Sequence, residues 1–251
     1  MKNTDEVGEF VDQLFSKPLP RVDDFDFGAK TAAVFDDMLD RSVPFYAEIQ
    51  RMVAELAADF AEPGGIVYDL GCSTGATFLA LDGLLRERPE VAFVGLDSSP
   101  EMLARARAKL NQKGVRRPCE LRLADFNHGV ELPDASVVVM LLTLQFVRPL
   151  HRESLLGSIF RDLRDKGCVI LVEKVLGEHS TFNRLFIEHY YELKRRSGYK
   201  DLEIGQKREA LENVLIPYRL EENRELLRRA GFREIDVFFK WYNFCGIIAS
   251  K

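Results

Sequence analysis

The sequence predicts an α/β protein built on a doubly wound, mostly parallel sheet of seven strands. Strand-like and helix-like segments alternate from residue 66 to residue 175, which is typical of parallel strands with helices on both faces. The segment SVVVMLLTLQFV at 136–147 is apolar throughout, so both of its faces must be covered. A long aromatic segment at 234–250, bent near Tyr242 to Gly246, adds an antiparallel hairpin at one edge.

Composition places these strands in one globular unit. The chain has 251 residues, 46% hydrophobic and 30% charged, so we expect a single domain over 1–251. The net charge of -5 argues against a protein that binds a nucleic-acid backbone over a broad surface. We expect a cytoplasmic protein, because the N-terminus lacks a signal-peptide core and no apolar run approaches the roughly 18 residues of a membrane span. The four cysteines and four histidines show neither disulfide nor zinc spacing, so no metal is expected.

The first half of the chain shows clear element signals. Apolar positions at helical spacing over 31–60, broken near Pro44, predict a helical cap over 1–60. IVYDL at 66–70 is the first strand and leads to a helix at 76–88; VAFVGLD at 91–97 is the second strand. The next helix covers 99–114, with Ser99 as N-cap, Pro100 at the first helical position and Gly114 at the end.

The second half continues the alternation and adds an insertion. CELRLADF at 119–126 and the segment 136–147 are the third and fourth strands, and a helix at 153–167 leads to CVILVEKV at 168–175, the fifth. Residues 178–225 are rich in helix formers and in basic and aromatic side chains, which predicts a helical insertion before the hairpin. Its apolar residues exceed one helical stripe, so they indicate a partner surface or, with equal weight, packing in the core.

The turn after the first strand is the first candidate functional site in the sequence. Asp69 is followed by Gly71, Ser73 and Gly75, and we expect backbone N–H groups of this turn to approach a ligand closely. A dinucleotide enzyme would show G-x-G-x-x-G, whereas a carboxylate at Asp69 repels pyrophosphate and suits a positively charged ligand. A purely structural turn is the competing interpretation.

Two further carboxylates end neighbouring strands. Asp97 ends the second strand, where a carboxylate accepts hydrogen bonds from ribose hydroxyls, and Asp125 ends the third, where an adenine amino group is usually met. Together with the turn they predict a nucleoside site. S-adenosylmethionine, with a sulfonium and an ammonium, fits this set of charges.

At these residues the sequence closely resembles the carboxy-S-adenosyl-L-methionine synthases, from about Phe25 to the C-terminus. Residues 67–176 resemble the Rossmann-like fold of class I S-adenosylmethionine-dependent methyltransferases. The most specific stretches lie mainly outside that shared fold and are VFDDMLDRSVPFY at 34–46, VYDLGCSTGA at 67–76, TLQFV at 143–147, GYKDLEIGQKREALENVL at 198–215 and WYNFCGIIA at 241–249.

The resemblance implies a reaction and its partners. Such enzymes convert S-adenosylmethionine and prephenate to carboxy-S-adenosylmethionine and phenylpyruvate, and a separate enzyme uses the product to modify the wobble uridine of certain transfer RNAs. A homodimer is also implied. Arg208 matches the cation that pairs with the new carboxylate, although by itself it would be interpreted as a solvated arginine on a basic helix face.

The other site residues follow from the same motifs. Their family matches are Tyr46 near the methionine part, Gly71, Cys72 and Ser73 in the turn, Asp97 and Ser98 at the ribose, and Asp125 and Phe126 at the adenine. Cys72 is interpreted as a small residue in a packed turn rather than a nucleophile. Glu173 and Lys174 are left open between a simple ion pair and substrate binding.

One departure keeps other functions open. Leu141 stands where the family usually has an asparagine, which removes a polar contact to the ligand. The alternatives are an ordinary small-molecule methyltransferase and a non-catalytic protein that kept the nucleoside pocket. Tyr46 and Arg208 favour the synthase over both.

Overall fold

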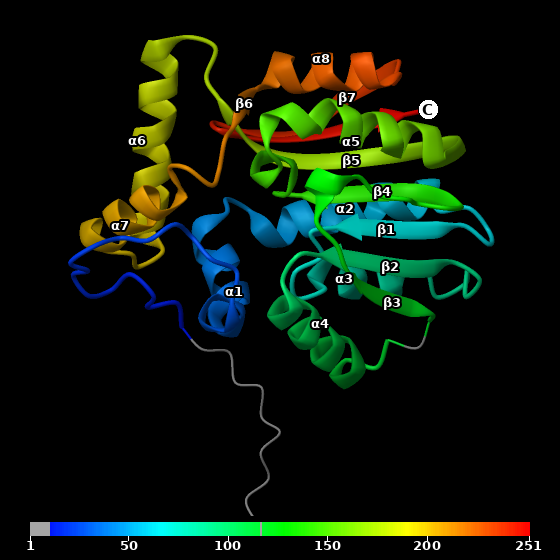
Figure 1. Ribbon diagram of the computed structural model, residues 1–251, viewed down its shortest axis with the longest axis horizontal. Coiled ribbons are helices and arrows are strands. Elements are labelled where there is room, and N and C mark those ends of the chain that lie inside the picture. The colour runs from blue at the N-terminus through cyan, green and yellow to red at the C-terminus, as the bar shows by residue number, and fades with distance from the viewer. Residues whose placement is uncertain (1–10, 116) are drawn as a thin grey trace, which may run out of the picture.

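The computed structural model describes residues 11–115 and 117–251, arranged around one sheet (Figure 1). Strands β1 (Ile66–Leu70), β2 (Ala92–Asp97), β3 (Cys119–Leu123), β4 (Ala135–Leu141) and β5 (Leu163–Leu176) are parallel. Strand β8 (Phe244–Ser250) runs antiparallel to β5 and to β7 (Glu234–Trp241). The order is β3-β2-β1-β4-β5-β8-β7, with the short β6 (Tyr218–Arg219) paired to β5. The predicted parallel sheet with a C-terminal antiparallel hairpin is confirmed.

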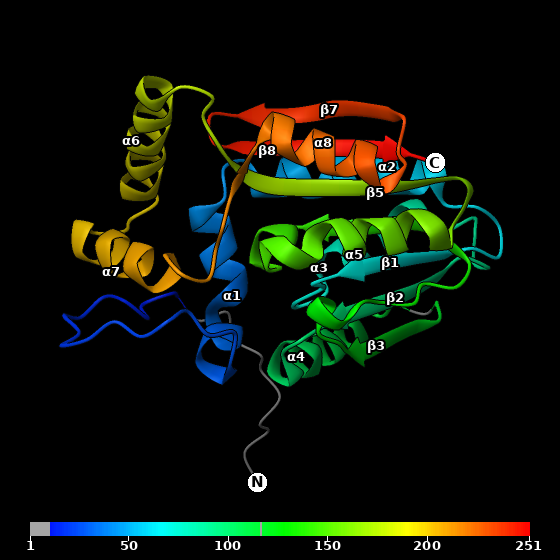
Figure 2. The same ribbon diagram turned by 45° about the horizontal axis from the view of Figure 1, so that its top comes forward.

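Helices cover both faces of this sheet and one end of it. Helices α5 (Pro149–Asp162) and α8 (Leu220–Ala230) lie on one face, and α2 (Tyr46–Phe60) and α3 (Ala76–Leu84) lie on the other (Figure 2). Helix α4 (Pro100–Gln112) follows β2, and its N-cap Ser99 accepts the Met102 N–H at 3.1 Å, as predicted. Helices α1 (Ala29–Ser42), α6 (Ser180–Arg196) and α7 (Asp201–Leu211) gather beyond the carboxyl ends of the parallel strands.

The core has two layers because successive strand residues point to opposite faces. In β4, Val138 and Met140 pack in the layer that α5 and α8 complete, whereas Val137 and Val139 pack in the layer that α2 and α3 complete. All four are fully buried. The continuous apolar segment thus belongs to a central strand covered on both faces, as expected.

Several boundaries differ from the expectation. The fourth strand ends at Leu141, because Leu142 adopts a left-handed conformation and a 3₁₀ turn, η2 (Leu144–Phe146), follows. Helix α5 begins earlier, at Pro149, and ends at Asp162, since Leu163 already pairs with Ala135 in the sheet. The expected insertion, 178–225, contains α6, α7 and β6, and its upper bound falls inside α8.

Residues 11–28, which we call the N-terminal strap, have no regular secondary structure and lie along α7. The Gln206 side chain accepts the Leu19 N–H at 2.7 Å and donates to the carbonyls of Phe15 and Lys17 at 2.9 Å. The Phe25 N–H donates to the Ala210 carbonyl at 2.8 Å. Hydrogen bonds to the middle and the end of α7 therefore hold the strap in place.

Among the described residues, no helix is both long and apolar enough to cross a membrane. The same residues contain no group of three or more histidine, cysteine or acidic side chains arranged to hold a metal ion.

Candidate functional site

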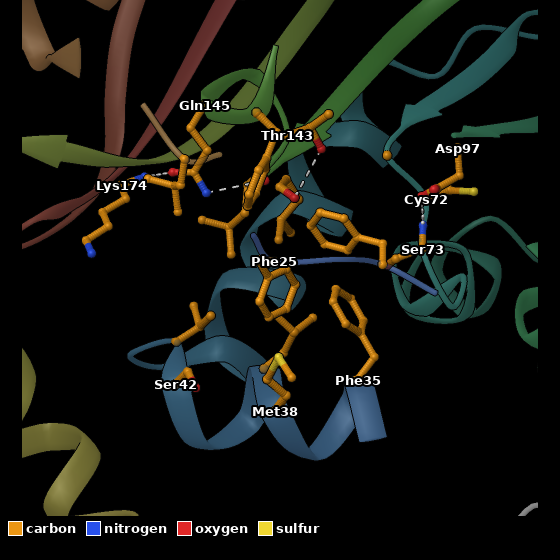
Figure 3. A pocket seen from close by; sticks show the side chains of 18 of the residues that line it. Phe25, Phe35, Met38, Ser42, Cys72, Ser73, Asp97, Thr143, Gln145 and Lys174 are labelled. Atoms are coloured by element: carbon orange, nitrogen blue, oxygen red, sulfur yellow. Dashed lines mark hydrogen bonds between the residues drawn. The ribbon is translucent and has the colours of Figure 1, made fainter. Parts of the chain in front are cut away.

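A cavity of about 240 Å³ lies at the carboxyl ends of the parallel strands. The strap and α1 supply one of its other walls (Figure 3), and α6 and α7 also contribute to its lining through Tyr190 and Lys207. Among the predicted site residues, those that line it are Tyr46, Gly71, Cys72, Ser73, Asp97, Ser98, Asp125 and Phe126. Arg208 does not line it: this side chain is exposed on α7, and its neighbour Lys207 faces the cavity instead.

The turn between β1 and α3 contributes shape rather than free amides. Gly71 has φ +80°, and a Cβ there would lie 2.3 Å from the Thr143 Oγ1. The N–H groups of Gly71 and Cys72 donate to the Leu96 carbonyl at 2.7 and 3.1 Å, and that of Ser73 donates to Asp97 at 2.9 Å. These three amides are already paired within the protein, contrary to the expectation that they face a ligand. Because Gly71 has no side chain, the backbone of the turn can lie close against Thr143 at the cavity wall.

Asp97 is held by backbone on both of its oxygens. It is 8% exposed, and its Oδ2 and Oδ1 accept the N–H groups of Ser73 and Ser99, each at 2.9 Å. Burial raises the pKa of this carboxyl, and the amide hydrogen bonds partly offset the rise. Each carboxylate oxygen has a further lone pair, so Asp97 can still accept hydrogen bonds from ligand hydroxyls.

Asp125 and Phe126 form the rim of the same end. The Asp125 Oδ1 accepts both the Asn127 N–H at 3.0 Å and its amide Nδ2 at 2.8 Å, and the backbone N–H in particular lowers the pKa of Asp125. Asp125 is exposed and Phe126 is buried, and both line the cavity. A carboxylate and an apolar ring suit the polar edge and flat face of a nucleobase.

Unsatisfied acceptors lie near Tyr46. The Gln50 Nε2 donates to the Tyr46 Oη at 2.9 Å, but the Gln50 Oε1 and the Asp69 Oδ1 are buried without a donor in the described part of the chain. Burial raises the pKa of Asp69 to about 7 and also raises the pKa of Tyr46. Tyr46 and Gln50 line the cavity whereas Asp69 does not, so a ligand with an ammonium group would supply a donor to the Gln50 Oε1 and positive charge near Asp69, and the residues present fit S-adenosylmethionine.

Glu173 and Lys174 do not form the ion pair that was one alternative. The Glu173 oxygens accept the N–H groups of Leu144 and Gln145, each at 2.9 Å, and thereby fix the turn after β4. Burial raises the pKa of Glu173 to about 8 against the effect of those two amides. Lys174 points to the other face of β5 and lines the cavity, where burial lowers its pKa to about 8.

Leu141 also lines the cavity, at the position where the sequence departs from the family pattern. Two polar residues of the following turn, Thr143 and Gln145, line it as well. The Gln145 Oε1 accepts the Lys174 N–H at 3.0 Å, so this amide is largely used within the protein. Thr143 is therefore the better candidate to replace the polar contact that an asparagine at residue 141 would make.

Sequence reasoning missed one wall of the cavity. Phe25 and Phe27 of the strap line it, as do Tyr190 of α6 and Lys207 of α7. The strap has neither a helical nor a strand period, so no pattern places it over a pocket. The start of the family resemblance at Phe25 was the one signal that these aromatics matter.

The cavity therefore has two chemically different ends. Figure 3 shows Asp97, Cys72 and Ser73 at one side and Lys174 with Gln145 at the other, with Phe25 and Phe35 between them. The first end carries carboxylates, and the second carries lysines. One ligand, or two ligands side by side, of mixed charge would match this arrangement.

Comparisons with known proteins find similar sequences over nearly the whole chain. Residues 67–167 match the family model described as a methyltransferase domain. A carboxy-S-adenosyl-L-methionine synthase of Methylococcus capsulatus is 56% identical over 240 residues, which cover 96% of this chain and 99% of the relative. A synthase of the same name from Desulfotalea psychrophila is 42% identical over 243 residues, covering 96% and 97%.

Solved structures agree on the fold. An S-adenosylmethionine-dependent methyltransferase from Aquifex aeolicus superposes with a TM-score of 0.59 at 17% identity, covering 90% of this chain and 98% of that one. Human N-acetylserotonin methyltransferase, in complex with S-adenosylmethionine, superposes with a TM-score of 0.57 at 16% identity, covering 89% and 55%. The predicted methyltransferase-type, Rossmann-like fold is confirmed.

Proposed function

The chain belongs to the carboxy-S-adenosyl-L-methionine synthase family, and from this we propose that it converts S-adenosylmethionine and prephenate to carboxy-S-adenosylmethionine and phenylpyruvate. The observation that carries the proposal is 56% identity across nearly the whole of both chains. It extends well beyond the shared methyltransferase fold, through the α6–α7 region that walls the cavity.

The reaction balances without an added oxidant or reductant. Prephenate loses its ring carboxylate as carbon dioxide and its ring hydroxyl as hydroxide, and the ring becomes aromatic. The sulfonium methyl group gives up one proton, which the hydroxide takes to form water, and its carbon bonds to the carbon dioxide. The protein must hold the two reactants together and exclude water, and the aromatic strap over the cavity suits that task.

We assign S-adenosylmethionine to the carboxylate-rich end. Asp97 and Ser98 hold the ribose there, Asp125 and Phe126 hold the adenine, and Tyr46 lies beside the methionine part. Gly71, Cys72 and Ser73 form the wall against which the ligand lies.

Arg208 serves the reaction from a second subunit in this proposal. Its side chain is exposed and does not line the cavity of its own chain, but it follows Lys207, which does. A guanidinium that must pair with the new carboxylate then has to come from a neighbouring copy. We infer a homodimer in which α7 of each subunit faces the cavity of the other.

An aromatic surface formed by the start of α6 and by Tyr242 of the hairpin supports the dimer. Phe182, 53% exposed, stacks on Phe186, with 6.4 Å between ring centroids, and Tyr242 of the hairpin lies 5.4 Å from Phe186 and 4.7 Å from His189. Exposed aromatic groups of this kind are typical of protein interfaces.

Complementation between two variants tests both the reaction and the origin of the arginine. Arg208→Leu removes the cation, and Asp97→Ala weakens ligand binding in the cavity by about 1.5 to 3 kcal/mol. In a mixed dimer, the Arg208→Leu subunit has an intact cavity and the Asp97→Ala subunit has an intact Arg208. These two combine into one working site only if the arginine acts across the interface. Mixing the two variants should therefore restore phenylpyruvate formation. The assay uses a concentration of S-adenosylmethionine too low for the Asp97→Ala cavity to bind it. No recovery, with mixed dimers present by mass spectrometry, would place Arg208 in its own subunit.

An ordinary methyltransferase is the second candidate, favoured by the fold shared with the neighbours above. A methyltransferase needs no cation beside the sulfonium methyl, whereas a carboxylated ligand brings an anion there. Arg208→Leu should weaken carboxy-S-adenosylmethionine by about 2 to 4 kcal/mol more than S-adenosylmethionine. Equal losses, or no phenylpyruvate from the wild-type protein, would favour the methyltransferase. Mass spectrometry of the nucleoside that copurifies with the protein gives a second, independent test.

The product leaves for another enzyme in this proposal. Carboxy-S-adenosylmethionine would supply the modification of transfer-RNA wobble uridine in the cytoplasm, and this chain itself would not bind nucleic acid. The net charge of -5 accords with that division of labour.

A further inference from the structure

Three lysines from three elements lie together at the end of the cavity opposite Asp97, and two of them, Lys174 and Lys207, line it. Lys174 lies near the end of β5, Lys194 lies on α6 and Lys207 lies on α7. The ammonium groups of Lys174 and Lys194 lie 4.8 and 5.2 Å from the ring centroid of Tyr190. Those of Lys194 and Lys207 lie 5.8 and 5.4 Å from the ring centroid of Tyr199. Two aromatic rings thus link the three cations, which we call the lysine cluster.

Carboxylates neutralise only part of this charge. Lys207 lies 3.6 Å from the Asp12 Oδ2, which also accepts the Tyr199 hydroxyl at 2.6 Å. The nearby Arg41, stacked on Tyr199 at 4.1 Å, is paired with Asp37 at 3.1 Å. Within residues 11–115 and 117–251, no carboxylate lies within ion-pair distance of the Lys174 or Lys194 ammonium groups. The end of the cavity therefore carries an excess of positive charge.

This excess charge is held away from water. Lys194 and Lys207 are 5% and 6% exposed. Burial lowers the pKa of both side chains, and for Lys194 repulsion from Lys207 and Lys174 lowers it further. Without an anion these lysines lose their protons more readily, and an anion bound among them would favour their charged forms.

The excess charge does not suit the sulfonium ligand itself. The sulfonium and ammonium of S-adenosylmethionine are cations that the lysines would repel, its one anion is the carboxylate of the methionine part, and Asp97, assigned to the ribose, lies at the other end of the cavity (Figure 3). Lys174 and Lys207 nevertheless line the same cavity. An anion bound at the lysine cluster would lie next to the sulfonium ligand, where a second substrate has to be.

We propose that the lysine cluster binds the carboxylate that the carboxyl donor keeps, which for prephenate is that of its pyruvyl side chain. The inference rests on the proposed function. A cation that stabilised the departing ring carboxylate would oppose its loss as carbon dioxide, so the lysines act on the retained carboxylate. They orient the donor with its reactive ring toward the sulfonium end.

Single substitutions that keep side-chain length test the lysine cluster. Lys174→Met and Lys194→Met each remove a charge without leaving a carboxylate unpaired. Lys207→Met, by contrast, would leave the Asp12 carboxylate without its ion-pair partner. Lys174→Met should raise the KM for prephenate about 10- to 100-fold, the effect of losing one charge-assisted contact to a buried anion. Lys194 does not line the cavity, so Lys194→Met should raise this KM by a smaller factor, through the lost charge alone. The affinity for S-adenosylmethionine, measured by calorimetry, should change by less than about threefold. Lys113→Met, at an exposed position after α4, is the matched control and should leave both quantities unchanged.

Binding without turnover separates this inference from the proposed reaction. Prephenate is titrated into protein saturated with S-adenosylhomocysteine, which has no methyl group to react. If the Lys174 and Lys194 variants bind prephenate more weakly than wild-type protein does, the lysine cluster stands even if no phenylpyruvate forms with S-adenosylmethionine. If phenylpyruvate forms but both variants keep the wild-type KM, the reaction stands and the cluster assignment is overturned. A loss confined to S-adenosylmethionine affinity would assign the lysines to the methionine carboxylate and also overturn it.

Discussion

At Gly71 the backbone takes a left-handed conformation directly against the side chain of Thr143. The φ of +80° favours glycine, and a Cβ added at this residue would lie only 2.3 Å from the Thr143 Oγ1, which leaves no room for a side chain. Thr143 belongs to the turn that Glu173 fixes, so it cannot retreat without disturbing that turn. A single hydrogen atom at this residue sets the distance between β1 and β4 at the cavity wall.

Gly71→Ala should therefore weaken both folding and ligand binding. Backbone strain alone should lower the free energy of unfolding by about 1 to 3 kcal/mol, and the displaced wall should abolish calorimetric binding of S-adenosylmethionine. Gly83→Ala in α3 is the matched control, because nothing lies within 4 Å of its added Cβ. That control should raise stability by up to about 1 kcal/mol. Wild-type affinity in a folded Gly71→Ala protein would remove the turn from the site.

Asp69 should make stability depend on pH. Its pKa in the folded protein is raised to about 7 by burial, so the unfolded chain ionises first as pH rises. The stability that this carboxyl contributes is present below about pH 4 and is lost as pH rises toward 7, by at most about 1.4 kcal/mol per pH unit. Chemical denaturation of wild type and Asp69→Asn at several pH values isolates the effect. Parallel stability curves for the two proteins between pH 4 and 7 would contradict the raised pKa.

At the scale of elements, the strap and α7 form one unit, although no sequence pattern joins them. The Gln206 side chain holds three backbone groups of the strap, and Phe25 is bonded to the end of α7. The helices and strands were predictable from periodicity because each buries its own apolar face. The strap was not, since its contacts depend on residues far away in the sequence.

Gln206→Ala should release the strap without unfolding the sheet. Three hydrogen bonds are lost, each worth about 0.5 to 1.5 kcal/mol, which is enough to open the strap locally. Trypsin should then cut faster after Arg21, an exposed site in the strap, and hydrogen exchange over residues 11–28 should accelerate. Gln112→Ala, an exposed glutamine at the end of α4, should leave both rates unchanged. Unaltered cleavage in Gln206→Ala would show that other contacts hold the strap.

The turn after β4 shows a second limit of element prediction. The apolar run continues from Ser136 to Val147, so the sequence pattern predicts strand throughout. The strand stops at Leu141 because the Glu173 carboxylate captures two backbone amides of the turn. A buried carboxylate on a neighbouring strand leaves no periodic signal in the segment that it bends.

At the scale of the whole molecule, the site was predictable at one end and not at the other. Asp97 and Asp125 could be placed because the carboxyl ends of parallel strands share one edge of the sheet. Lys194 and Lys207 could not, because helices outside the sheet bring them there, and Arg208 beside them faces away. In our proposal, the second subunit completes the site.

The aromatic surface on α6 should then control activity through assembly. Phe182→Glu places a charge on that surface, where it should weaken the dimer at least about tenfold, measured by analytical ultracentrifugation. Turnover at low protein concentration should fall with the dimer fraction, while S-adenosylmethionine affinity stays at the wild-type value. Arg184→Glu, also exposed on α6 but outside the aromatic stack, serves as the charge control. A monomeric Phe182→Glu protein with full turnover would refute an active site shared between subunits.

The hydrogen bonds of the strap also bear on how the protein is made. Leu19 is bonded to Gln206, and Asp12 to Tyr199, in each case across 187 residues of chain. A ribosome releases the strap first and these two partners much later, so the early strap can bond to α1, where Asp37 accepts the Asp12 N–H and Arg41 donates to the Asp12 carbonyl, but not to the later helices. The parallel strands β1 to β5 are thus synthesised before the strap is fixed to α7 over the cavity. A chain stalled ahead of α7 would lack those contacts, and β7 and β8 as well, and could not shield its reactants from solvent.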